Sequence, residues 1–178
     1  MTNTRRVLLT AFFLAAGLVG VLTTPAPAQG WLSQGITLEQ SQRVADTLED
    51  GVTACLQVPI TYQPDCVGQV FRDAARQLAN NADYWEAEVA LTRVSRNAAM
   101  LVRSMKDEDA DRLRHDGNRL RAVTSPAGGV QYLGDLVTEA AGTVRSLSAY
   151  EVRLFAPIAE ALTDIAGRLS TGRSGSAS

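Results

Sequence analysis

The sequence predicts an all-α protein, an antiparallel bundle of four to five helices with one disulfide at a helix–helix hairpin. Apolar residues recur at spacings of three and four over most of the chain after residue 36, which is the period of a helix with one buried face. The alternating pattern of a strand is nowhere sustained. Prolines and capping signals divide the periodic region into helix-sized segments with short connections, which favours a bundle.

The region 1–28 has the three parts of a cleavable signal peptide. Arg5 and Arg6 supply positive charge, and an apolar stretch follows over 7–22. Small residues, among them Ala26 and Ala28, then form the cleavage site. The apolar stretch is shorter than the about 20 residues of a spanning helix. We therefore expect an exported protein, periplasmic or secreted, with no membrane span after signal cleavage.

The two adjacent arginines leave the export route open. They resemble the start of a twin-arginine signal, which exports proteins that have already folded around a cofactor. They also supply the ordinary positive charge of a signal peptide. Export of the unfolded chain is the preferred interpretation, because the remaining sequence has no cofactor motif.

After cleavage the chain divides into an N-terminal arm (29–36), a helical bundle domain (37–170) and a tail (171–178) whose Ser and Gly content predicts disorder. Loss of two arginines leaves 15 of the 17 basic residues against 19 acidic ones, a net charge of −4. An acidic chain has no general attraction to nucleic acid or to an anionic membrane. We therefore expect no nucleic-acid partner.

Cys55 and Cys66 are the two cysteines of the chain. In an oxidising compartment such a pair predicts a disulfide. Catalytic redox pairs have two intervening residues, and this pair is spaced far more widely, which favours a structural bridge. The bridge should join the end of the first helix to the start of the second and contribute about 3 kcal/mol.

The first two helices flank this cysteine pair. Thr37 and Gln40 have the spacing of a capping box and predict the start of the first helix, which should end near residue 55. Pro59 and Pro64 interrupt the pattern, and Asp65 is placed to cap the second helix. The expected inner faces are Leu38, Ala45, Leu48, Val52 and Cys55 in the first helix, and Val67, Val70, Phe71, Ala74 and Leu78 in the second.

Three later helices have equally regular apolar faces. Asp83 with Glu86 predicts a capping box for the third helix, and Ser125-Pro126 predicts the start of the fourth. In the last helix, Pro157 should cause a kink or mark the true start. The expected seams are Ala87, Leu91, Val94, Ala98, Leu101 and Met105; Val130, Leu133, Val137, Ala140, Val144 and Leu147; and Phe155, Ile158, Leu162, Ile165 and Leu169.

The segment 106–124 between the third and fourth helices is more polar. It is either a polar connector or a bent, exposed helix. Its acidic start, 107–111, resembles a calcium loop, but Arg112 and Asn118 stand where glycine and glutamate are required. We therefore expect no metal there.

The motifs of the common bundle cofactors and of hydrolases are missing from the sequence. A di-iron bundle needs Glu-x-x-His pairs, whereas the single histidine, His115, follows Arg112 at that spacing. Covalent haem needs Cys-x-x-Cys-His, and a serine hydrolase needs Gly-x-Ser-x-Gly. His115 lies among charged residues and is expected on the solvated surface. We expect no cofactor, no metal site, no catalytic residue and no enzymatic activity.

Large apolar residues alternate through the segment between the cysteines: Leu56, Val58, Ile60 and Tyr62. They either fold over the end of the bundle core or form a rigid, disulfide-framed contact surface for another protein. Tyr84 and Trp85, near the start of the third helix, admit the same two interpretations.

A short signature runs through the same segment: Cys55-Leu56, Pro59, Tyr62, Asp65 and Cys66. It resembles a signature of uncharacterised exported helical proteins of alphaproteobacteria. The resemblance implies export and a helical fold, and it implies no activity. We therefore expect a non-enzymatic helical binding or structural module of the cell envelope, whose partner is another envelope protein. The alternative is a carrier that holds a small apolar or haem-like ligand between its helices.

Overall fold

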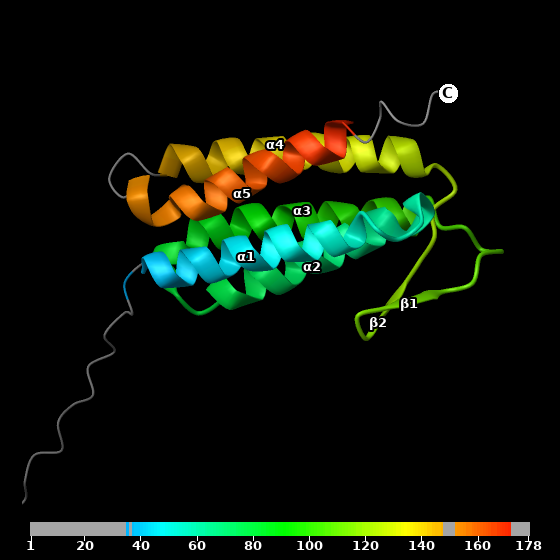
Figure 1. Cartoon of the computed structure of the whole chain (residues 1–178), viewed down its shortest axis with the longest axis horizontal. Helices are drawn as coiled ribbons and strands as arrows, with labels where there is room; N and C mark the ends of the chain where they lie inside the picture. Colours follow the sequence, from blue (N-terminus) through cyan, green and yellow to red (C-terminus); the bar gives the residue numbers. More distant parts are fainter. Residues whose placement is uncertain (1–34, 36, 148–151, 172–178) are drawn as a thin grey trace, which may run out of the picture. The chain divides into compact units, whose positions relative to one another are not determined.

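Five α-helices occupy most of the chain that the computed structural model describes, which comprises residues 35, 37–147 and 152–171 (Figure 1). Short 3₁₀ turns precede the second and third helices, and two short strands lie between the third and fourth. The predicted all-α bundle is thereby confirmed. The elements are α1 (Leu38–Cys55), η1 (Ile60–Tyr62), α2 (Gln63–Leu78), η2 (Ala82–Tyr84), α3 (Trp85–Ser104), β1 (Leu113–His115), β2 (Asn118–Leu120), α4 (Pro126–Leu147) and α5 (Val152–Thr171).

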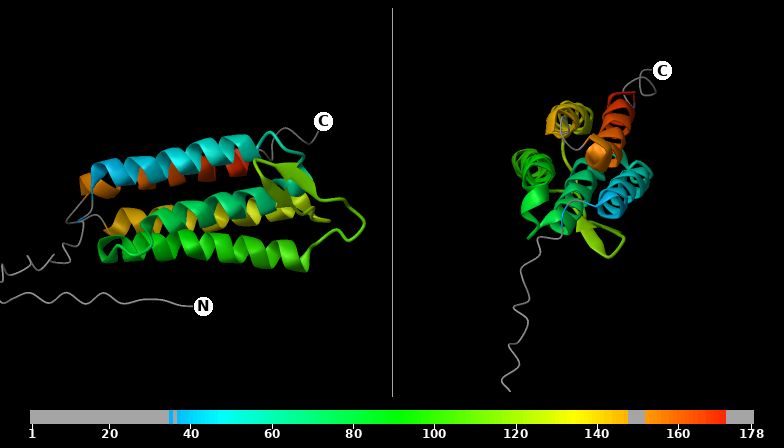
Figure 2. Two further views of the ribbon diagram at one scale, coloured as in Figure 1. Left: turned by 90° about the horizontal axis from the view of Figure 1, so that it is seen from below. Right: turned by 90° about the vertical axis from the view of Figure 1, so that its left-hand side faces the viewer.

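The helices form a closed ring in which each packs against the next and α5 packs against α1 (Figure 2). Consecutive helices run in opposite directions, so α1 and α5, the first and last of an odd number, run in the same direction (Figure 1). Each predicted seam points into the common core, except at a few helix ends. The largest of the fully buried side chains include Tyr84, Phe71, Leu48, Leu91, Leu133, Ile158 and Leu162.

The start of α1 differs from the prediction in two details. Thr37 caps the helix, because its hydroxyl accepts a hydrogen bond from the backbone N–H of Gln40 at 3.2 Å. The side chain of Gln40 does not complete the box; it donates to the carbonyl of Gln77 at the end of α2. Leu38, expected on the inner face, is exposed, and Ser41 takes the inward position of the first turn.

The second helix begins earlier than predicted. Its first residue is Gln63, and Pro64 lies in the first turn, where the missing N–H needs no partner. Asp65 is therefore not the cap. Its carboxylate accepts instead from the backbone N–H of Arg121, 2.8 Å away, which ties the helix to the connector.

The third helix begins after an extra 3₁₀ turn. Asn81 caps that turn, since its side-chain oxygen accepts from the N–H of Asp83, so Asp83 does not cap α3 as predicted. The fourth helix starts at Pro126, as expected. In α5, Pro157 lies inside the helix and is not its start. The signal peptide, most of the arm and residues 172–178 of the predicted tail lie outside the described residues; Thr171, the first residue of that predicted tail, is instead the last residue of α5.

The segment 106–124 is a connector that contains a β-hairpin, not a helix. The two strands pair antiparallel with Leu113 opposite Leu120. Asp116 and Gly117 form the turn with φ values of 45° and 76°, and a two-residue hairpin turn with positive φ at both positions favours Asp-Gly. This dipeptide was the sequence signal for the hairpin, although the strands are too short for alternation to reveal them.

Several hydrogen bonds fix the connector to the disulfide end of the bundle. The N–H of Val123 donates to the carbonyl of Thr61 at 2.9 Å. The hydroxyl of Tyr62 donates to the carbonyl of Asp111 at 2.7 Å. Leu120 is buried, and Val123 packs in a small cluster with the end of α3. The hairpin is therefore held against the bundle at both ends.

Close packing of α2 on α3 depends on Gly68. A Cβ atom at this position would lie 2.7 Å from the Cβ atom of Ala98 on α3. We expect Gly68→Ala to lower the free energy of unfolding by about 1–3 kcal/mol, because the two helices must move apart. Urea unfolding followed by circular dichroism measures this change.

An exchange of the two side chains provides the control. The double variant Gly68→Ala/Ala98→Gly keeps one methyl group in the contact and the same helix propensity overall, so it should recover most of the loss. A Cβ atom added at Gly142 on α4 would have no neighbouring atom within 4 Å, so Gly142→Ala should not destabilise the protein. Equal stability of the Gly68→Ala and Gly142→Ala variants would contradict the expectation.

Candidate functional site

The disulfide forms one corner of the molecule. Cys55 is the last residue of α1 and Cys66 lies in the first turns of α2, with their Cα atoms 5.5 Å apart. Both residues are buried. The predicted bridge is confirmed, and it joins two consecutive antiparallel helices where they meet.

The four apolar residues between the cysteines do not share one environment. Val58 belongs to the buried core, and Leu56 and Tyr62 are partly buried against it. Ile60 is 41% exposed. Most of this loop therefore covers the end of the core. A contact with another protein at this loop stays a prediction, and Ile60 is the residue most open to it.

The sequence did not decide whether Tyr84 and Trp85 pack on the core or form a contact surface, and the structure gives the two residues opposite environments. Tyr84 is fully buried, and its ring meets the edge of Phe155 with centroids 5.5 Å apart. Its hydroxyl donates to the carbonyl of Thr37 at 2.8 Å and accepts from the N–H of the same residue at 3.0 Å. The hydroxyl of Ser41 lies 3.2 Å away. Trp85, by contrast, is 61% exposed.

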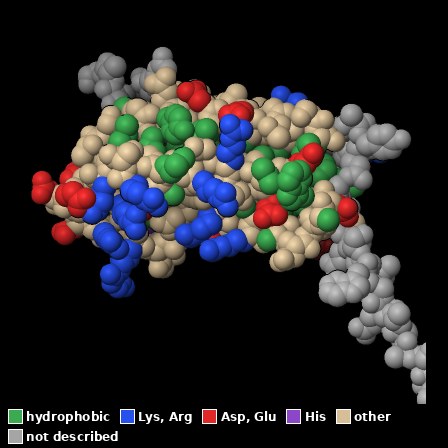
Figure 3. All heavy atoms as spheres, turned by 180° about the vertical axis from the view of Figure 1, so that it is seen from behind, with side chains coloured by type: hydrophobic (Ala, Val, Ile, Leu, Met, Phe, Trp, Pro, Cys, Tyr) green, Lys and Arg blue, Asp and Glu red, His purple; other side chains and the backbone are tan. Residues whose placement is uncertain are grey.

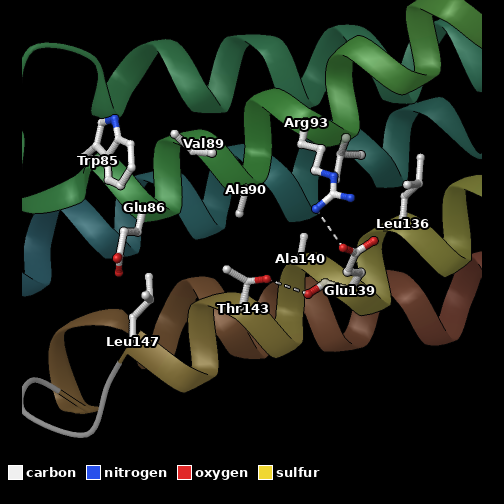
Figure 4. A pocket seen from close by; sticks show the side chains of 11 residues that line it. Trp85, Glu86, Val89, Ala90, Arg93, Leu136, Glu139, Ala140, Thr143 and Leu147 are labelled. Atoms are coloured by element: carbon white, nitrogen blue, oxygen red, sulfur yellow. Dashed lines mark hydrogen bonds and ion pairs between the residues drawn. The ribbon is translucent and has the colours of Figure 1, made fainter.

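Trp85 stands at one end of a groove between α3 and α4 (Figure 4). The groove has a volume of about 200 Å³. Ala90 of α3 and Ala140 of α4 face each other across it, and Leu147 lies near the same end as Trp85 (Figure 4). Its walls are mainly apolar. The lining residues are Trp85, Glu86, Val89, Ala90, Arg93, Val94, Leu136, Glu139, Ala140, Thr143 and Leu147.

The charged groups of the groove lie towards its two ends (Figure 4). At the end away from Trp85, a guanidinium nitrogen of Arg93 lies 2.8 Å from a carboxylate oxygen of Glu139. Both side chains are more than half exposed, so this ion pair contributes little to stability. Glu86 lies at the other end, and the structure records no ion pair for it with another described residue. The groove therefore holds two acids and one base, a net charge of −1.

Further apolar side chains are exposed along the same two helices. Met100 projects from α3 and Tyr132 projects from α4. Figure 3 shows green patches separated by basic side chains over the face seen from behind, which α3 and α4 form. The predicted seams contain only inward-facing residues and therefore do not reveal this surface. The sequence indicates the surface by apolar residues that lie outside the predicted seam of α3, such as Trp85 and Val89, which are four positions apart on one side of the helix.

The groove offers mainly apolar binding surface, with two carboxylates, one guanidinium group and one hydroxyl in its lining. Its lining contains no histidine, cysteine or serine. Over the described residues, no three or more His, Cys, Asp or Glu side chains gather as a metal site would require. Within the same residues, no helix is both long enough and apolar enough to cross a bilayer.

His115 is placed differently from the expectation. It lies on the inner side of the hairpin, above α1 and α2, and its side chain is only about a quarter exposed. The sequence predicted a solvated surface residue, and the strand pairing overturns this by turning the ring towards the bundle. Its Nε2 atom lies 3.3 Å from a carboxylate oxygen of Asp116.

Comparison with known proteins yields no match: no protein-family model, no curated protein and no solved structure is similar to this chain.

Proposed function

We propose that the protein is an exported, non-enzymatic binding module of the cell envelope, which holds an amphipathic helix of another envelope protein in the α3–α4 groove. The observation that carries the proposal is the apolar groove with the exposed indole of Trp85 at its end. Exposed aromatic side chains beside apolar pockets are the typical anchors of protein interfaces. The Cys55–Cys66 bridge is compatible with the oxidising compartment that the signal sequence predicts.

The shape of the groove supports a helical partner. It lies lengthwise between two antiparallel helices, and its α4 wall extends from Leu136 to Leu147. At 1.5 Å per residue this wall is about 16 Å long, or three helical turns. The small side chains of Ala90 and Ala140 allow a third backbone to approach closely. A helix with apolar residues at spacings of three and four fits such a groove.

The charge of the groove supports a partner with basic flanks. Arg93 is already paired with Glu139. Glu86 lies beside the apolar wall near Trp85 without a recorded ion pair among the described residues. A lysine or arginine of the partner beside its apolar stripe would pair with Glu86 and contact the indole face.

The volume of the groove favours this function over the carriage of a haem-like ligand. Sites that enclose small molecules usually measure about 300–1,000 Å³. The groove measures about 200 Å³, which suits a few side chains of a partner helix better than a macrocycle.

Site-specific photo-crosslinking in the protein's own host tests the proposal. A photoreactive residue at Val89, in the groove, should form an adduct with an envelope protein. The same residue at Glu49, exposed on α1, should form none. Peptide mapping should place the crosslink in an apolar helical stripe flanked by lysine or arginine.

The affinity and stability of a Trp85→Ala variant test the contribution of the indole to partner binding. Trp85→Ala should weaken binding of the identified partner segment about 30-fold, as expected for an aromatic anchor of an interface. Because Trp85 is largely exposed, this variant should unfold at the same urea concentration as the wild type. Equal crosslinking from positions 89 and 49, or a mapped segment with no amphipathic helix, would refute the proposed function.

A further inference from the structure

The β1–β2 hairpin carries four arginines on one face. Arg114 and Arg119 are direct cross-strand partners. Arg112 lies one residue before β1 and Arg121 one residue after β2, and continuing the alternation of strand side chains by one residue at each end puts all four on the same side. All four are exposed, whereas Leu120, on the other side, is buried.

These positive charges have no partner within the described part of the molecule. The structure records no ion pair or side-chain hydrogen bond for any of the four guanidinium groups with a described residue. Among the acids of the same connector, Glu108 pairs with Lys106 and Asp116 lies beside His115, whereas Asp109 and Asp111 are exposed and have no recorded ion pair with a described residue. Like charges directly opposite each other in a hairpin are about 4.5–5.5 Å apart at Cβ and are destabilising. An external anion would relieve this repulsion.

The hairpin presents these groups from a fixed backbone. The N–H of Arg121 donates to Asp65 of α2, and the N–H of Val123 donates to the carbonyl of Thr61. The hydroxyl of Tyr62 holds the preceding segment at Asp111. The four guanidinium groups therefore need little backbone ordering when they bind a ligand, which favours affinity.

We propose that this four-arginine face binds the phosphate groups of anionic phospholipids and so rests on a membrane surface. Guanidinium groups form paired hydrogen bonds with phosphate. Figure 3 shows basic side chains, with acidic side chains beside them, towards the end of the molecule where the hairpin lies in Figure 1. The net charge of the chain suggested no attraction to such membranes; the strand register changes this by collecting four charges on one side.

A membrane fits the charge distribution better than a nucleic acid does. The chain has a net charge of −2 and a pI near 5.4, whereas domains that bind nucleic acid commonly have a pI above 9. A membrane meets only the face turned towards it, and each arginine near an anionic surface strengthens binding about fivefold.

Vesicle sedimentation tests the proposal on the full chain. Wild type should bind vesicles of phosphatidylcholine mixed with phosphatidylglycerol more strongly than vesicles of phosphatidylcholine alone. Glutamine in place of Arg112, Arg114, Arg119 and Arg121 should lower the partition coefficient to the anionic vesicles roughly 600-fold. The apolar run at 7–22 is present in every variant, so differences between variants report on the hairpin.

A matched variant removes the same charge elsewhere. Glutamine in place of four exposed arginines on the helices, Arg43, Arg76, Arg96 and Arg153, should leave most of the anionic-vesicle binding intact. Thermal unfolding checks that both variants are folded. Should the hairpin variant be unfolded, Arg114→Gln/Arg119→Gln is used instead and should weaken binding roughly 25-fold.

Three results would overturn the inference. The first is equal binding of wild type to both kinds of vesicle. The second is an equal loss of binding in the hairpin and control variants. The third is hairpin-dependent binding to a DNA oligonucleotide without binding to vesicles, which would assign the four arginines to a nucleic acid.

Discussion

Replacement of Tyr84 by alanine should lower the free energy of unfolding by about 3–5 kcal/mol. The ring is fully buried and packs edge-on against Phe155 of α5. Its hydroxyl binds both backbone groups of Thr37, ahead of α1. One side chain at the start of α3 therefore joins the starts of α1 and α5, and its removal leaves a cavity and unpaired polar groups. Urea unfolding followed by circular dichroism measures the loss.

The variant Tyr84→Phe separates the ring from its hydroxyl. It keeps the packing but leaves the N–H of Thr37 without this acceptor, and we expect a loss of about 1–3 kcal/mol. The loss in free energy of unfolding that Tyr84→Ala shows beyond that of Tyr84→Phe is then due to removal of the ring and the cavity that it leaves. A Tyr84→Phe variant as stable as the wild type would show that water replaces the hydroxyl without cost and would contradict the expectation.

Removal of the disulfide should have an effect of similar size. The double variant Cys55→Ala/Cys66→Ala should lose about 3 kcal/mol, mainly because the unfolded chain gains the freedom of the opened loop. The two cysteines are separated by 11 positions, so the closed loop is short and the expected effect stays near the middle of the usual range. Urea unfolding of both proteins, with and without reductant, measures it.

The reductant supplies the control for this prediction. Reduction should lower the stability of the wild type by about the same 3 kcal/mol and leave the alanine variant unchanged. Alkylation without reductant should label neither cysteine of the wild type. Uptake of two labels by the folded wild type, or a double variant as stable as the oxidised protein, would contradict the expectation.

Sequence periodicity predicted the helices well because each helix has one continuous apolar face. The seams through Leu91 of α3, Val137 of α4 and Leu162 of α5 are buried over most of their length, as expected, while Met105 and Leu147 at the seam ends are partly exposed. Helix starts were less accurate. Asp65 had the spacing of a cap, but the structure uses its carboxylate to hold the N–H of Arg121, a partner far away in the sequence.

The binding surfaces were harder to predict because they are made between elements. The α3–α4 groove depends on which two helices are neighbours, and no single helix reveals this. The sequence singled out Trp85 without separating it from Tyr84, although one is exposed and the other buried. The sequence grouped Ile60 with Leu56, Val58 and Tyr62 as one possible contact surface, but in the structure the last three pack in or against the core.

The sequence by itself determined the helical class, the cysteine pair and the inner face of each helix, because these depend on local periodicity and composition. Only the tertiary structure decided that Arg114 faces Arg119 and that Trp85 flanks a groove, because both follow from pairing between separate segments. Net charge sums over the whole chain and therefore suggested no affinity for anionic surfaces. The position of each charge depends on the fold, and the hairpin gathers four of them on one side.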